Sequence, residues 1–145
     1  MLQGRCLCGA LRFTAEGPPK WTSYCHCQSC RRHTGAPVSA YAGFEATKVR
    51  LDGELTYFSS SPGVRRGFCG RCGSTLTYEG DRWPGEIHLH IGAFDDPSTL
   101  AMVFRNRSRD HARNAYLMLY EPEQLTARAG QGVRQGFAHA GPLEL

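Results

Sequence analysis

The sequence predicts a mainly β fold, and three observations indicate it. Short stretches in which apolar and polar residues alternate recur along the chain, as in strands that bury one face. Turn-forming residues are frequent, with 17 glycines and 8 prolines among 145 residues. The length suits one domain of ordinary size. We therefore expect a single domain over residues 1–125, followed by a Gly- and Ala-rich tail over residues 126–145 that is loosely ordered.

Alternation predicts strands at residues 11–15, 38–44, 54–59, 64–68, 74–79 and 86–91, with a further candidate at 117–120. Residues 29–35 predict one short helical turn that stops at Gly35. Asp96 before Pro97 predicts a second helix start, because Asp caps the free N–H groups and Pro suits the first helical position.

The cysteines are expected to be reduced. The chain has no apolar run of about 18 residues, so we expect no membrane span. Its first residues lack the apolar core of a signal peptide, so we expect a cytoplasmic protein. In a reducing compartment clustered cysteines bind metals or do chemistry more often than they form disulfides. The count of seven cysteines is also odd, so disulfides cannot use them all.

The formal net charge of +4 is a weak sign of nucleic-acid binding. Seven metal-bound thiolates with two zinc ions would lower it by three, to +1. Part of the basic excess therefore balances anionic metal sites, and we expect no nucleic-acid partner.

Four cysteines predict a structural zinc site. Cys6 and Cys8 form one pair, and Cys69 and Cys72 form another, each within a glycine-containing turn. Glycine permits the positive φ angles that aim backbone N–H groups at sulfur. Four thiolates complete the tetrahedral shell of a structural zinc ion. The alternatives are free buried cysteines or redox-active pairs.

The other three cysteines, Cys25, Cys27 and Cys30, predict a second zinc site with a ligand position to spare. Three protein ligands and one open position are typical of catalytic zinc. Three thiolates make that zinc anionic and a weak activator of water, and a soft site suits a further sulfur ligand. A thiol bound to zinc is deprotonated outright, so this site favours presenting a small thiol as a nucleophile to an aldehyde.

Other readings of this segment remain open. His26 or His33 completes the shell in one of them, which makes a second structural site. In another, Cys27 and Cys30 form a redox pair, and in a third the site holds no metal. Four arginines near the metal segments are candidates to grip the carboxylates of a thiol such as glutathione, or are plain surface charge: Arg31, Arg32, Arg65 and Arg66.

The motifs together resemble the glutathione-dependent formaldehyde-activating enzyme family, also called the centromere-protein-V-like family. The matching segments, within residues 4–104, are Gly4-x-Cys6-x-Cys8-Gly9, Cys25-His26-Cys27-x-x-Cys30-Arg31-Arg32-x-x-Gly35, Phe68-Cys69-Gly70-Arg71-Cys72-Gly73 and Gly92-x-x-Asp95-Asp96-Pro97.

The resemblance implies a β-tent fold of several coiled antiparallel sheets with short helical turns. It also implies structural zinc on the first four cysteines and catalytic zinc on Cys25, Cys27 and Cys30. The implied activity is a carbon–sulfur lyase that interconverts S-hydroxymethylglutathione with glutathione and formaldehyde. A carrier that binds glutathione without turnover and a zinc-stabilised interaction module are the alternative functions.

Overall fold

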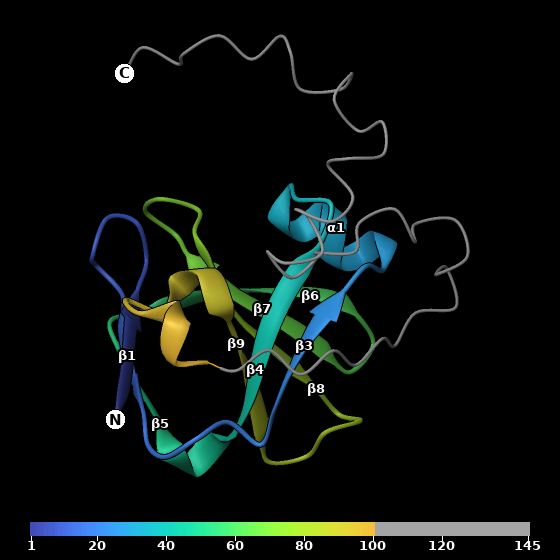
Figure 1. Ribbon diagram of the computed structural model, residues 1–145. Helices are drawn as coiled ribbons and strands as arrows, with labels where there is room; N and C mark the ends of the chain where they lie inside the picture. The colour runs from blue at the N-terminus through green and yellow to red at the C-terminus, as the bar shows by residue number, and fades with distance from the viewer. Residues whose placement is uncertain (101–145) are drawn as a thin grey trace, which may run out of the picture. The chain divides into compact units, whose positions relative to one another are not determined.

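The computed structural model of the chain describes residues 1–100 (Figure 1). These residues form nine β-strands in two sheets, and every strand pair among them is antiparallel. The predicted mainly β fold is therefore confirmed. The predicted strand at 117–120, the domain end at 125 and the tail lie outside the described residues.

The smaller sheet has three strands in the order β1 (Leu2–Arg5), β2 (Arg12–Ala15) and β5 (Val49–Asp52). The larger sheet has six, in the order β3 (Trp21–Cys25), β4 (Ser39–Glu45), β9 (Glu86–His90), β8 (Thr75–Gly80), β7 (Val64–Cys69) and β6 (Leu55–Ser61). The helix α1 (Gln28–Thr34) follows β3 directly and lies at the end of that strand in Figure 1.

Three single 3-10 turns complete the described elements: Ala46–Lys48, Ile91–Ala93 and Pro97–Thr99. The predicted caps are confirmed. Gly35 ends α1 with a left-handed φ of 65°, and the Asp96 side chain accepts a hydrogen bond from the N–H of Ser98. None of the helices in this part of the chain is long and apolar enough to cross a membrane.

The hydrophobic core joins residues of the small sheet to one face of the large sheet. Phe13 of β2 meets Phe94 edge-on at 4.9 Å between ring centroids, and Phe94 stacks on Phe44 of β4 at 6.2 Å. Gly4 of β1 permits this close packing, because a Cβ there would lie 2.2 Å from the Phe13 ring. The two sheets therefore depend on one shared set of buried aromatic side chains.

The opposite face of the large sheet carries polar and aromatic side chains. On β9, Ile87 and Leu89 belong to the core cluster, whereas His88 and His90 point to the other face, as strand alternation requires. Tyr41 of β4 pairs with His90 and shares that face. This polar and aromatic face positions the candidate site.

Candidate metal centres and their cavity

The four predicted structural ligands lie together. The sulfur atoms of Cys6, Cys8, Cys69 and Cys72 all lie within 4.8 Å of one another. The Cys6 and Cys8 sulfurs are 3.5 Å apart, and those of Cys8 and Cys69 are 3.8 Å apart. A tetrahedral site with Zn–S bonds of about 2.3 Å has edges of about 3.8 Å. The four sulfurs therefore fit a tetrahedral zinc ion.

Two tight turns produce this arrangement. One joins β1 to β2 and carries Cys6 and Cys8. The other follows Cys69, the last residue of β7, and carries Cys72 before β8 begins. Gly9 and Gly73, at the ends of the turns, have φ angles of 73° and 75°, which favour glycine. The N–H of Leu11 donates to the Cys6 sulfur at 3.2 Å. The turns thus supply both the ligands and their supporting hydrogen bonds.

The thiols of this group differ in acidity. The side-chain and backbone hydrogen bonds of Ser74 lower the pKa of Cys72 to about 5. The N–H of Ala10 lowers the pKa of Cys8, but the neighbouring thiols of Cys6, Cys72 and Cys69 together with desolvation outweigh it and raise the pKa to about 11. In this group the Cys72 sulfur is ionised at neutral pH and the Cys8 sulfur is protonated. A divalent cation bound to all four sulfurs would displace the remaining protons.

The second cysteine group is built from one short segment. Cys25 ends β3, Cys27 is the N-cap of α1, and Cys30 lies in the first turn of the helix. The Cys27 sulfur accepts a hydrogen bond from the N–H of Cys30 at 3.4 Å. The three sulfurs lie within 4.8 Å of one another. Turn, cap and helix therefore bring all three to one point.

A buried arginine faces this group from β7. Arg66 is only 4% exposed, and its Nη1 and Nη2 atoms donate to the Cys30 sulfur at 3.7 and 3.8 Å. Its Nε donates to Ser60 at 2.9 Å, and its guanidinium lies 5.0 Å from the centre of the Tyr78 ring. These contacts fix a positive charge against a sulfur atom.

The electrostatics favour a thiolate at Cys30. A hydrogen bond from Cys25, with smaller contributions from Tyr41 and Arg66, lowers the pKa of Cys30 to about 4 despite burial. The interaction with Cys30 raises the pKa of Cys25. Burial, and then the Cys30 charge, raise the pKa of Tyr41, which stays a neutral phenol.

Neither histidine near the segment belongs to this ligand group. The group consists of three sulfurs, and His26 and His33 are not among its members. The His33 ring instead lies 6.0 Å from that of His90. Burial lowers the pKa of His33, which favours its neutral form. Among the described residues, the donor set of the second group therefore stops at three.

A cavity of about 560 Å³ opens beside the three sulfurs, and all three cysteines line it. Its polar wall includes Arg66, Arg82 and serine hydroxyls. The rest of the wall is mostly aromatic and comes from β3, β4, β8, β9 and the loop after β8: Trp21, Tyr24, Tyr41, Tyr78, Trp83 and His88. This volume suits a small organic ligand, since such sites measure about 300–1,000 Å³.

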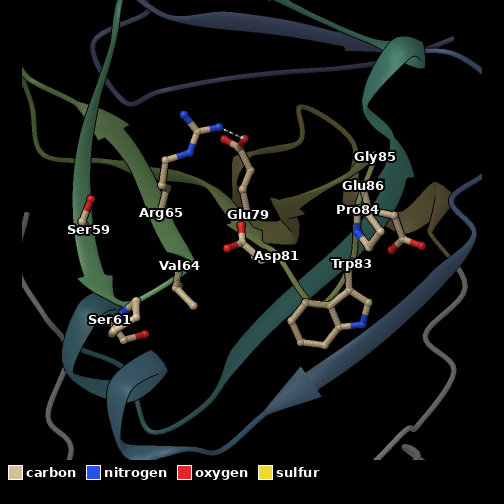
Figure 2. A pocket seen from close by; sticks show the side chains of 13 residues that line it. Ser59, Ser61, Val64, Arg65, Glu79, Asp81, Trp83, Pro84, Gly85 and Glu86 are labelled. Carbon is tan, nitrogen blue, oxygen red and sulfur yellow. Dashed lines mark hydrogen bonds and ion pairs between the residues drawn. The ribbon is translucent and has the colours of Figure 1, made fainter.

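The four predicted arginines are not placed alike. Arg66 lines the cavity, whereas Arg31, Arg32 and Arg65 do not. Arg65 donates to Glu79 at 2.7 Å in a neighbouring cleft of about 870 Å³. Figure 2 shows this cleft, with the Arg65 side of its wall opposite Trp83 and Glu86.

Sequence reasoning missed Arg82 and the aromatic wall. Arg82 follows β8 and lies 6.0 Å from the centre of the Trp83 ring. The available signal was the spacing of Tyr78, Trp83 and His88, which alternation and a tight turn bring to one face of the sheet. Their joint position depends on strand order, which the sequence does not state.

Comparison with known proteins agrees with this geometry. The sequence pattern of the glutathione-dependent formaldehyde-activating enzyme family matches residues 1–110. The chain belongs to this family. A Halomonas elongata protein named as such an enzyme is 34% identical over 127 residues, covering 74% of this chain and 77% of that protein. An uncharacterized lyase of Schizosaccharomyces pombe is 32% identical over 76 residues, covering 52% and 56% of the two chains.

Two further matches are to proteins that do not carry the name of this family. The riboflavin synthase of Methanothermobacter thermautotrophicus is 45% identical over 58 residues, which is 40% of this chain and only 38% of that enzyme. So short a match carries no activity to this chain. A crystal structure of a Rhodobacter sphaeroides protein has a TM-score of 0.53 and 24% identity, covering 70% of this chain and 97% of that one. It supports the fold.

Proposed function

We propose that the protein is a zinc-dependent enzyme of the carbon–sulfur lyase type. In this proposal Cys25, Cys27 and Cys30 would hold a zinc ion, and a small thiol such as glutathione binds in the cavity beside these three cysteines. The thiol adds to formaldehyde or a related aldehyde, and the reverse reaction splits the adduct. Cys6, Cys8, Cys69 and Cys72 hold a separate, structural zinc ion. Family membership and the lyase name of one relative support the reaction class.

One observation carries the proposal: a three-sulfur ligand group that opens onto a cavity large enough for a thiol adduct. A buried site with four protein ligands has no position for substrate, whereas a three-ligand site has one. The soft sulfur donors suit zinc and a further sulfur ligand. Zinc held there supplies a position at which a thiol is bound in its deprotonated form.

Arg66 has a defined part in this scheme. Three thiolates around a divalent cation carry one net negative charge, and a thiolate substrate adds another. The Arg66 guanidinium, held against the Cys30 sulfur, offsets part of that charge. Its contacts with Cys30, Ser60 and Tyr78 also leave it poorly placed to grip a substrate carboxylate.

Arg82 is the better candidate for that grip, because it lines the cavity and is an exposed residue. The carboxylate-binding role of Arg31, Arg32 and Arg65 stays a prediction. These residues contact the ligand only if it extends beyond the cavity.

The reaction needs no redox partner. In the direction of synthesis the thiolate sulfur attacks the carbonyl carbon, a carbon–sulfur bond forms, and the carbonyl oxygen takes up a proton. In the lyase direction the hydroxyl gives up its proton, the carbon–sulfur bond breaks, and the aldehyde leaves. Holding sulfur and aldehyde together in one cavity accelerates either direction by fixing their geometry.

Exchange spectroscopy tests the proposal. The rate of S-hydroxymethylglutathione formation is measured by proton exchange with the zinc-loaded full chain, and we expect an increase over the spontaneous reaction. Cys27→Ser is the matched variant, and it should lose the increase. A zinc-loaded chain that gives only the spontaneous rate would contradict the proposal. If calorimetry then detects saturable glutathione binding, the protein is a carrier.

A further inference from the structure

We propose that the cavity beside the three-cysteine group contains a subsite for a flat aromatic ring, so that the adduct bound there carries an aromatic group. The subsite, here called the ring subsite, is formed by Trp21, Tyr78, Trp83 and His88. The inference rests on the proposed function only in placing the sulfur of the adduct at the three-cysteine group.

The ring subsite does not serve the hydrophobic core. The core cluster contains none of the four side chains of the subsite. Trp21, Tyr78 and Trp83 are partly exposed, and they line the cavity together with the three cysteines. A partly exposed aromatic surface inside a cavity points to a ligand, because folding alone favours burying such side chains.

The four rings form a connected set. The Trp21 and Trp83 rings meet His88 edge-on, at centroid distances of 4.5 and 5.1 Å. The Tyr78 ring stacks on His88 at 5.4 Å with 15° between the planes. Trp83 also meets Tyr78 edge-on at 5.9 Å. Rings that brace one another hold their shape before a ligand arrives, which lowers the entropy cost of binding.

Two polar atoms of the set face a single carboxylate. The Trp21 Nε1 donates to Glu86 Oε2 at 3.1 Å, and His88 Nε2 lies 3.4 Å from the same oxygen. Lys20 pairs with the other oxygen of Glu86. Gly43 gives Trp21 room, since a Cβ there would lie 2.3 Å from the indole. These contacts turn the Trp21 N–H and the His88 Nε2 toward Glu86, so these two rings meet a ligand mainly through carbon.

The charges at the ring subsite indicate which kind of aromatic ring it favours. Arg66 lies 5.0 Å from the Tyr78 ring centre, and Arg82 lies 6.0 Å from that of Trp83. Two guanidinium groups favour an electron-rich or anionic ring over a cationic one. The ring enters with either the aldehyde or the thiol.

Intrinsic fluorescence tests binding directly. Trp21 and Trp83 are the two tryptophans of the chain, and both line the cavity. We expect S-benzylglutathione to quench their emission and to bind about tenfold or more tightly than S-methylglutathione, since one stacked ring is worth that much. Equal affinities of the two probes would overturn the subsite.

Variants locate the effect. In Trp83→Leu the affinity ratio between the two probes should fall toward one, whereas Trp83→Phe should keep most of it. Tyr57→Leu is the matched control, because Tyr57 is 43% exposed and lies outside the cavity lining. A ratio that drops equally in Tyr57→Leu and Trp83→Leu would overturn the inference, since the ring would then bind elsewhere.

Rate measurements separate this inference from the proposed function. Benzaldehyde with glutathione brings the ring with the aldehyde, and formaldehyde with benzyl mercaptan brings it with the thiol; the faster pair identifies the source. If no pair reacts above the spontaneous rate but the probe ratio responds to Trp83→Leu, the ring subsite stands and the proposed function fails. If glutathione and formaldehyde react faster with the protein but the probe ratio is one, the subsite alone fails.

Discussion

The two cysteine groups of this protein differ in what they connect. The sulfurs of Cys8 and Cys69 meet across 61 residues of sequence and join a turn of the small sheet to a turn of the large sheet. Cys25, Cys27 and Cys30 come from one turn and the start of α1. A metal at the first group would close a long loop, whereas a metal at the second would close almost none.

They differ also in their surroundings. Cys6, Cys69 and Cys72 belong to or pack on the core cluster, whereas the three-cysteine group is absent from it and lines the cavity with the aromatic wall. The second group has a buried arginine against one sulfur, and the first has backbone N–H groups and Ser74. The same ligand chemistry therefore suits the fold in one place and a reaction in the other.

The largest effect should follow from Cys72→Ser. Structural zinc binding contributes on the order of 10–16 kcal/mol, about as much as the whole stability of a domain, which is roughly 5–15 kcal/mol. Because Cys72 is one of four sulfurs at that site, we expect the variant to lose its cooperative thermal unfolding transition, as followed by circular dichroism. A variant that unfolds cooperatively near the wild-type temperature would show that the first group is not structural.

Cys27→Ser should remove the second metal and leave the fold intact. Serine is a favoured N-cap residue, so it keeps the cap of α1 while the sulfur is lost. We expect elemental analysis of the full chain to give two zinc ions in the wild type and one in the variant, with the unfolding transition retained. Two ions in the variant, or loss of the fold, would remove the distinction between the two groups.

Some features of the two cysteine groups and of the fold can be predicted from the sequence, and others cannot. Cysteine spacing predicts the three-cysteine group and each pair of the four-cysteine group, because ligands within a tight turn are close whatever the rest of the fold does. That the two pairs share one metal is predicted by the four ligands of a structural zinc ion and not by spacing, since 61 residues separate Cys8 from Cys69. Strands with strong alternation, such as β4 and β9, are predicted to within about two residues. The strand β3 was missed because Thr22, Ser23 and Tyr24 give it no clear apolar alternation.

The cavity could not be predicted in the same way. Arg65 and Arg66 are neighbours in the sequence, yet only Arg66 reaches the Cys30 sulfur, because adjacent residues of β7 point to opposite faces. The order of the strands determines which of these two arginines points toward the site. Trp21 and His88 meet for the same reason, across 67 positions of sequence.

Arg66→Met should alter metal uptake at the second group and spare the first. Without the guanidinium the pKa of Cys30 rises, so its proton competes with zinc at higher pH. We expect the pH midpoint of zinc binding at this group to rise by about one unit, which is about 1.4 kcal/mol. Arg66→Lys, which keeps the charge, should restore part of the shift. An unchanged midpoint in Arg66→Met would exclude an electrostatic role.

His90→Gln should have the smallest effect, and it tests the region between the two groups. His90 is buried against Tyr41, at 4.4 Å between ring centroids, and lines a cavity that it shares with Cys6 and Cys8. Burial, then the charges of His33 and Arg66, lower the pKa of His90 to about 3. In the unfolded chain the pKa of histidine is about 6.5.

Between pH 6.5 and 3 the unfolded state therefore binds the proton and the folded state does not, so stability falls as the pH is lowered. From pH 7 to 5.5 the loss due to His90 is about 1 kcal/mol. The free energy of unfolding is measured in urea for the zinc-loaded wild type and His90→Gln at both pH values. The difference between the two proteins isolates the contribution of His90, because protonation of the cysteine ligands affects both alike. Equal pH dependence in the two would mean that the pKa of His90 is not lowered in the folded chain, so that the cavity it shares with Cys6 and Cys8 admits protons from solvent.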